Sequence, residues 1–110
     1  MTNPPRGELP GVLGLAHRAG QVVRGTDSVR RALRDGQLHL VLLARDAASA
    51  QRSKLTGLIS GSETPTRVVG TRVELGVAVG AGPLSAVGVT DRGFAEKIDK
   101  ALQVDATLAQ

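Results

Sequence analysis

Residues 22–34 combine the residue types that bind anions. A short apolar stretch runs into Arg24 and a glycine turn at Gly25, and a helix is expected behind that turn. The helix carries three arginines within five positions, Arg30, Arg31 and Arg34. The N–H groups and the positive dipole end of a helix start attract anions, and arginines one turn further in can bind phosphates or a guanine edge. The segment therefore suits a phosphate backbone; the competing interpretation is a basic helix face that contacts only solvent.

The charge of the chain is unevenly distributed. Its 110 residues include 14 Lys or Arg and 10 Asp or Glu, a formal net charge of +4. Residues 1–55 hold nine basic and four acidic side chains, whereas residues 56–110 hold five and six. One basic half fits a surface that binds a polyanion, and the predominance of arginine favours bidentate contacts with phosphate and guanine.

The composition excludes several classes of protein. The chain has one Phe and neither Trp nor Tyr, so it offers no aromatic platform for single-stranded bases. It has no cysteine, which excludes a disulfide framework and a thiolate metal site. No apolar run approaches the ~20 residues of a membrane helix, and the N-terminus lacks a signal-peptide core. We therefore expect a cytoplasmic protein without a membrane partner.

The sequence also gives little support to catalysis. His17 and His39 have no nearby Cys or clustered carboxylate pair, and metal and nucleophile sites need several convergent groups. We place His39 in a buried strand and interpret His17 as a surface or partly buried side chain. Gly76, Gly80 and Gly82 match no nucleotide-binding pattern and are interpreted as a helix end and a turn. We expect no metal, no cofactor and no enzymatic activity.

Hydrophobic periodicity predicts helices that alternate with strands along the whole chain. Strands are expected at residues 21–24, 38–44, 66–69 and 84–89, and helices at 9–19, 27–35, before the 61–65 loop, at 72–79 and from about 91 to 104. This alternation predicts a three-layer α/β/α sandwich. The nearly continuous apolar residues 38–44 indicate a central strand buried on both faces. A chain of this length forms a single domain, at residues 8–104, between a disordered tail at 1–7 and a frayed C-terminus at 105–110.

Several polar residues have the positions of helix caps. Thr71 and Glu74 have the spacing of a capping box. The helix before residue 61 is capped by Asp46 or Ser49. The last helix is capped by Thr90 or Asp91.

Five segments then stand in a recognisable order and spacing: Leu13–Gly20, Arg24–Thr26 with its basic helix, Leu40–Ala47, Glu74–Gly80 and Val89–Ala95. Together, over roughly residues 9–103, they resemble the ribosomal kink-turn RNA-binding superfamily (L-seven-Ae / L-thirty-e), most closely its small bacterial YlxQ-like branch. The resemblance implies the same sandwich with a mixed four-stranded sheet, and a monomer.

The resemblance also implies an RNA site. A kink-turn is a sharply bent RNA helix whose bend is followed by tandem sheared G–A pairs. In the family, an Asn, a Glu and a Lys at the start of the second helix read these pairs and neighbouring phosphates, and the corresponding positions here are Asp27, Ser28 and Arg31. The loop before the last strand, here residues 81–84, packs against a base thrown out of the kink.

All three helix positions and the loop depart from the family pattern. Arg31 keeps the positive charge and can bind a phosphate or a guanine edge. Asp27 cannot donate a hydrogen bond when it is ionised, so it either accepts from guanine N–H groups or serves as a helix N-cap. Ser28 is too short to span the distance that a Glu spans, and Leu84 is the only large apolar residue of the loop.

The sequence thus predicts a non-enzymatic protein that binds structured RNA, a kink-turn or ribosomal RNA, with the ribosome as a candidate partner. The expected contact residues are Arg24, Gly25, Thr26, Asp27, Ser28, Arg30, Arg31, Arg34, Arg45, Ala81, Gly82, Pro83 and Leu84. The alternative is a protein-interaction module of the same fold that has lost kink-turn recognition. An accessory enzymatic domain that acts on RNA is the third and weakest hypothesis.

Overall fold

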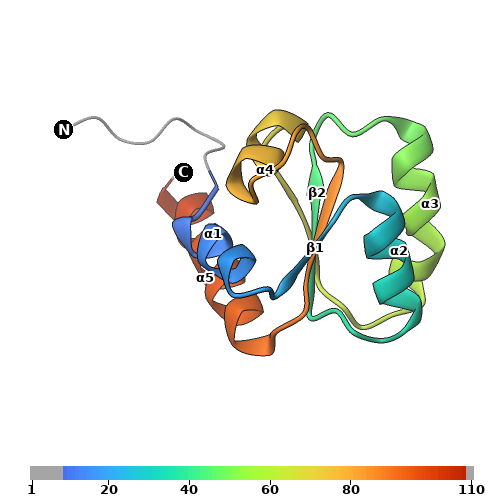
Figure 1. Cartoon of the computed structure of the whole chain (residues 1–110), viewed down its shortest axis with the longest axis horizontal. Coiled ribbons are helices and arrows are strands. Elements are labelled where there is room, and N and C mark those ends of the chain that lie inside the picture. The colour runs from blue at the N-terminus through green and yellow to red at the C-terminus, as the bar shows by residue number, and fades with distance from the viewer. Residues whose placement is uncertain (1–8, 109–110) are drawn as a thin grey trace.

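The computed structural model describes residues 9–108, which form five helices and one four-stranded sheet (Figure 1). The helices are α1 (Gly11–Arg18), α2 (Thr26–Arg34), α3 (Ser49–Ser60), α4 (Arg72–Ala78) and α5 (Arg92–Leu108). The strands are β1 (Val22–Arg24), β2 (Leu40–Ala44), β3 (Thr66–Val69) and β4 (Ala86–Val89). The tail expected at residues 1–7 lies outside the described residues, as do residues 109–110 of the expected C-terminal tail.

The sheet is mixed, with strand order β1-β4-β2-β3. β2 and β3 are parallel, whereas β4 runs antiparallel to both of its neighbours, β1 and β2. Helices cover both faces: α1, α4 and α5 lie on one side of the strands, and α2 and α3 lie on the other (Figure 1). The α/β/α sandwich predicted from the alternation of elements is confirmed.

Burial along β2 shows how the central strand serves both cores. Leu40 and Leu42 belong to the core under α1, α4 and α5, while Val41 between them belongs to the core under α2 and α3. Successive side chains of a strand point to opposite faces, so an unbroken apolar run is required where both faces are covered. The prediction of a strand buried on both faces is confirmed.

The start of β2 differs from the expectation. The strand begins at Leu40, and His39, expected in a buried strand, is exposed just before it. Leu38 is nevertheless buried, because Gly88 of β4 leaves space for its side chain. A Cβ atom at Gly88 would lie 2.7 Å from Leu38 Cδ1.

Two of the expected caps are confirmed. Thr71 and Glu74 form a reciprocal capping box at α4: the Glu74 N–H donates to Thr71 Oγ1 at 3.1 Å, and the Thr71 N–H donates to Glu74 Oε1 at 2.8 Å. At α5, Asp91 rather than Thr90 is the cap, since its Oδ2 accepts from the Phe94 N–H at 2.8 Å.

The prediction of a side-chain cap for α3 was wrong. Its N-cap is Ala48, with no side-chain hydrogen bond, so neither Asp46 nor Ser49 caps it. Asp46 Oδ1 instead accepts from the backbone N–H of Arg72 at 2.8 Å, at the start of α4. The parallel strands β2 and β3 end at the same edge of the sheet, which brings the residues after β2 to the helix that follows β3.

At the C-terminus, α5 continues to Leu108, beyond Val104 where fraying was expected. No glycine or proline follows Gly93 in this helix to interrupt its backbone hydrogen bonds. Within residues 9–108, no helix has the length and apolar character needed to cross a membrane.

Candidate nucleic-acid interface

One edge of the sheet gathers three helix starts. β1, β2 and β3 end at this edge, since their last residues lie beside the first residues of β4 or beside one another in the register. α2, α3 and α4 follow these strands, so all three begin here (Figure 1). The first N–H groups of a helix carry partial positive charge, and this edge therefore favours anions. Both segments predicted to bind RNA, residues 24–34 and 81–84, meet at this edge.

The start of α2 owes its shape to Gly25. This residue is the N-cap, with φ 95° and ψ 155°, a conformation that is essentially restricted to glycine. Its carbonyl oxygen accepts from the Val29 N–H at 3.0 Å and closes the first turn. Because glycine has no side chain to accept from the other first-turn N–H groups, the positive end of α2 has no side-chain cap.

The side chains of this first turn occupy different environments. Thr26 is only 8% exposed, so its backbone rather than its side chain is offered to a ligand. Ser28 is partly buried. Asp27 is the second residue of α2, not its cap, and its carboxylate is 3.8 Å from Lys54 Nζ of α3 with 78% of the side chain exposed. The N-cap role considered for Asp27 is therefore wrong, and its contact with RNA stays a prediction.

The three arginines of α2 have no acidic partner among the described residues, so their charges are available to a ligand. Arg31 and Arg34 are exposed and Arg30 is partly buried. None of the three forms an ion pair with another residue in the described part of the chain. Asp27 and Arg31 are four residues apart, so they share one face of the helix.

The second predicted segment belongs to the α4–β4 loop, residues 80–85. α4 ends at Ala78 with Val79 as its C-cap, and Gly80 follows with φ 68°. The Gly80 N–H donates to Val77 O at 3.2 Å and the Ala81 N–H donates to Gly76 O at 2.8 Å. This pair of bonds is a Schellman motif. Gly82 and Pro83 are exposed, whereas Ala81 and Leu84 are partly buried and pack against the core.

Gly76 lets this loop fold back onto α4. A Cβ atom at Gly76 would overlap the carbonyl group of Gly82 and lie 2.9 Å from Ala81 O. The Leu84 N–H donates to Arg72 O at 3.0 Å, so Leu84 pairs with α4 and the strand β4 starts at Ala86, two residues later than expected. Gly76 is a buried residue inside α4, within the helix expected at residues 72–79, while Gly80 and Gly82 form the helix end and the turn.

Arg24, the last residue of β1, and Gly25, the N-cap of α2, connect the two segments. Arg24 Nη1 donates to the carbonyl oxygen of Val79 at 3.3 Å, directly before the α4–β4 loop. The Gly25 N–H donates to Ala86 O at 2.9 Å, directly after that loop. The start of α2 and the loop are thereby held side by side, although 55 residues separate Arg24 from Val79.

Further basic residues lie at the same edge. Arg45 is exposed at the end of β2, and its carbonyl oxygen accepts from Arg52 Nη2 at 3.0 Å. Arg72 at the start of α4 was not among the expected contact residues, and its Nε is 3.7 Å from Asp46 Oδ2. The hydrogen bond from the Arg72 N–H lowers the pKa of Asp46 despite partial desolvation, with a smaller contribution from the Arg72 charge. Arg72 begins the helix that follows β3, and the parallel pairing of β3 with β2, which no local pattern predicts, places it at this edge.

His17 borders the α4–β4 loop. It is partly buried in the last turn of α1, and a Cβ atom at Gly80 would lie 3.2 Å from its Nε2. Among residues 9–103, whose side chains are described, no group of three or more His, Cys, Asp or Glu could hold a metal ion.

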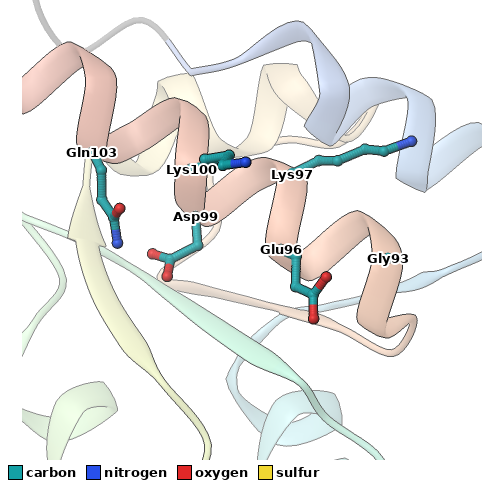
Figure 2. Close-up of a pocket in the computed structure, with 6 residues that line it drawn as sticks. All are labelled: Gly93, Glu96, Lys97, Asp99, Lys100 and Gln103. Atoms are coloured by element: carbon teal, nitrogen blue, oxygen red, sulfur yellow. The ribbon is translucent and has the colours of Figure 1, made fainter.

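A separate groove runs along α5 (Figure 2). It is lined by Gly93, Glu96, Lys97, Asp99, Lys100 and Gln103. Asp99 forms a bidentate ion pair with Arg67 of β3, at 2.8 and 3.2 Å. Figure 2 shows the acidic side chains of the groove on the strand side of α5 and the lysines on its other side. This mixture of charges does not favour a polyanion.

The structure is thus a small α/β/α domain with a basic sheet edge, where glycines allow the turns. The model of the Ribosomal protein L7Ae/L30e/S12e/Gadd45 family matches residues 8–99, which include both segments of the edge. The chain belongs to this family.

Two bacterial relatives are similar over most of their length. The RNA-binding protein YlxQ of Bacillus subtilis (strain 168) is 40% identical over 87 residues, 79% of this chain and 87% of that protein. The RNA-binding protein YlxQ of Enterococcus faecium is 26% identical over 103 residues, 94% of this chain and 99% of that protein.

Solved structures share the fold. A protein of unknown function from Bacillus halodurans superposes with a TM-score of 0.79 at 36% identity, covering 84% of this chain and 94% of its own. The Giardia lamblia 15.5kD RNA binding protein superposes with a TM-score of 0.72 at 17% identity, covering 86% of this chain and 84% of its own. The second similarity extends to the fold alone.

Proposed function

We propose that this protein binds structured RNA through the sheet edge that holds the start of α2 and the α4–β4 loop, and that it has no enzymatic activity. The observation that carries the proposal is the juxtaposition of these two segments through Arg24 and Gly25. The start of α2, which has no side-chain cap, and its arginines, which form no ion pair with the described residues, supply donors for phosphates. The names of both bacterial relatives, which are RNA-binding proteins, support the same function.

The RNA that fits this edge best is a kink-turn or a similarly bent helix. Its two features, a phosphate backbone close to G–A pairs and a base outside the stack, correspond to two different surfaces. Arg31 on α2 suits a phosphate or a guanine edge. Pro83 is exposed in the α4–β4 loop and offers an apolar surface to an extruded base, while Leu84 beside it is partly buried in the core.

The family supports a proposal for the class of RNA and for the partner. Its description names ribosomal proteins, which supports ribosomal RNA as the ligand and the ribosome as a partner. We propose that the protein acts in the cytoplasm as a monomer.

Two exposed valines favour a second candidate function. Val73 and Val77 lie one turn apart on α4 with 59% and 73% of their surface exposed. Exposed apolar side chains in a row suit a protein partner. The second candidate is therefore a protein-interaction module of the same fold.

A binding experiment separates these functions. We would measure the affinity for a standard kink-turn RNA and for the same RNA with its G–A pairs replaced by Watson–Crick pairs, at moderate salt. The proposal predicts a strong preference for the intact kink, with an affinity that falls steeply as salt increases. Equal, salt-sensitive affinities for the two RNAs would mean that the protein binds RNA only through a generic basic surface. Absence of binding to both RNAs would favour the protein-interaction module.

A further inference from the structure

The α4–β4 loop is attached to the start of α2 at both of its ends. Before the loop, the Arg24 guanidinium donates to Val79 O at 3.3 Å; after it, the Gly25 N–H donates to Ala86 O at 2.9 Å. Two consecutive residues, the last of β1 and the N-cap of α2, therefore bracket the six residues of the loop. One attachment uses the backbone and is independent of residue type, whereas the other depends on a side chain.

Val79 is a favourable acceptor for a cation. It is the C-cap of α4 and is fully buried, so its position is fixed by the core. The last carbonyl groups of a helix carry partial negative charge, which a guanidinium compensates. The bond to Arg24 thus joins the end of α4 to the strand that leads into α2.

We propose that Arg24 is a positioning residue that holds the α4–β4 loop at a fixed place beside the start of α2 for RNA binding. The inference rests on the proposed function, since both surfaces must meet one RNA at the same time. A folded RNA has a fixed spacing between its phosphates and its extruded base. A loop that already has the matching position loses less conformational entropy when it binds.

The alternative role for Arg24 is a simple phosphate contact. Its side chain is exposed, so its other N–H groups are open to solvent. The two roles predict different behaviour for lysine at this position. Lysine keeps the positive charge, but its nitrogen lies one bond short of Nη1 and presents no planar fork. A phosphate contact tolerates this exchange; attachment to Val79 O does not.

The first test requires no RNA. Amide hydrogen exchange of the free protein is measured for wild type, Arg24→Lys and, as a matched control, Arg45→Lys. We expect Arg24→Lys to accelerate exchange of the Ala81 and Leu84 amides about fivefold, the effect of losing one hydrogen bond. Arg45→Lys, at the same edge without a bond to the loop, should leave both amides unchanged. Unchanged loop amides in Arg24→Lys would overturn the positioning role.

The second test measures whether Arg24 acts on RNA through the loop. Affinity for the kink-turn RNA is measured for Arg24→Lys in the wild-type background and in a Pro83→Gly background, where the loop is already loosened. We expect a loss of about fivefold in the first background and of less than about twofold in the second. Equal losses in both backgrounds would assign Arg24 to a direct contact and overturn the proposal.

The two tests also separate this inference from the proposed function. If wild type shows no preference for the intact kink, the proposed function fails, while the amide exchange still reports on attachment of the loop. If wild type shows the preference and Arg24→Lys retains it in full, the function stands and the positioning role fails. Thermal unfolding of each variant verifies that it is folded.

Discussion

The two segments of the candidate interface are constructed in opposite ways. The start of α2 depends only on residues that are adjacent in sequence. Gly25 makes the turn, its carbonyl group accepts from the Val29 N–H, and the arginines follow within nine residues. The α4–β4 loop is shaped by residues outside it: Gly76 leaves space for it, Arg72 O accepts from Leu84, and Arg24 holds its first end. The local segment should therefore respond to changes in its own side chains, and the loop to changes elsewhere.

The strongest test of this difference is Gly76→Ala. The new Cβ atom would overlap the carbonyl group of Gly82, so either α4 or the loop must shift. We expect a loss of about 2–3 kcal/mol in the free energy of unfolding, typical of an overpacked site. The displaced loop should also weaken kink-turn RNA binding more than about tenfold. Urea unfolding and RNA titration measure the two effects.

Gly57→Ala is the matched control. Gly57 lies in α3, is exposed, and has no atom within 4 Å of the position of a Cβ. Alanine should raise the free energy of unfolding by about 0.5–1 kcal/mol, because it favours the helix more than glycine does. It should leave RNA affinity unchanged. A Gly76→Ala protein as stable as wild type would show that the loop does not depend on close approach to α4.

The same contrast explains what could be predicted from the sequence. The layers and the strands follow from periods of 2.0 and 3.6 in the apolar residues, and the double burial of β2 follows from its unbroken apolar run; all these patterns are local. The exact starts of β2 and β4 are not local. Leu38 is buried over Gly88, and the Leu84 N–H bonds to α4, so tertiary contacts rather than the apolar pattern set both boundaries.

The candidate site divides in the same way. The arginines and the glycine turn of α2 are adjacent in sequence, and their types alone indicated an anion-binding segment. The partner of Asp46, by contrast, is the backbone of Arg72, 26 residues away. Local spacing made Asp46 a cap for α3; only the parallel pairing of β2 and β3 brings it to α4. The close approach of Gly76 to Gly82 in the loop is also absent from any local pattern, since six residues separate them in sequence.

The local segment is tested by Arg31→Ala. Arg31 is exposed and has no ion-pair partner among the described residues, so its loss should hardly affect folding. Because Arg31 is expected to bind a guanine edge or a phosphate, the variant should lose about 1–3 kcal/mol of binding free energy for the kink-turn RNA. Arg92→Ala is the matched control, since it removes the same charge from an exposed residue at the start of α5. Equal losses in both variants would mean that only net charge matters.

A smaller effect is expected from Asp27→Asn. Asp27 brings a negative charge to the first turn of α2, and its contact with Lys54 is largely exposed. Stability should change by less than about 0.5 kcal/mol, since exposed ion pairs contribute little. RNA affinity should rise about two- to fivefold, because a charge that repels phosphate is removed.

The control for Asp27 is Asp35→Asn at the other end of the same helix. Asp35 is the exposed C-cap of α2, so the same change of charge lies farther from the helix start and should alter affinity less. Titrations at two salt concentrations measure both variants. A lower affinity for Asp27→Asn would contradict the expectation and identify the ionised carboxylate as an acceptor for guanine N–H groups.

The smallest effect is expected from Asp46→Asn, which changes the contact between Asp46 and the start of α4. The Arg72 N–H holds the pKa of Asp46 below its ordinary value of 3.8, so the ionised carboxylate is favoured in the folded protein. Its contribution to stability is complete above that value and is lost as the pH falls through the lowered pKa. Asp46→Asn keeps an oxygen acceptor but no charge. Thermal unfolding should therefore show wild type more stable near neutral pH, with the difference vanishing in acid. Equal stabilities near neutral pH would mean that the hydrogen bond, which asparagine keeps, and not the charge joins β2 to α4.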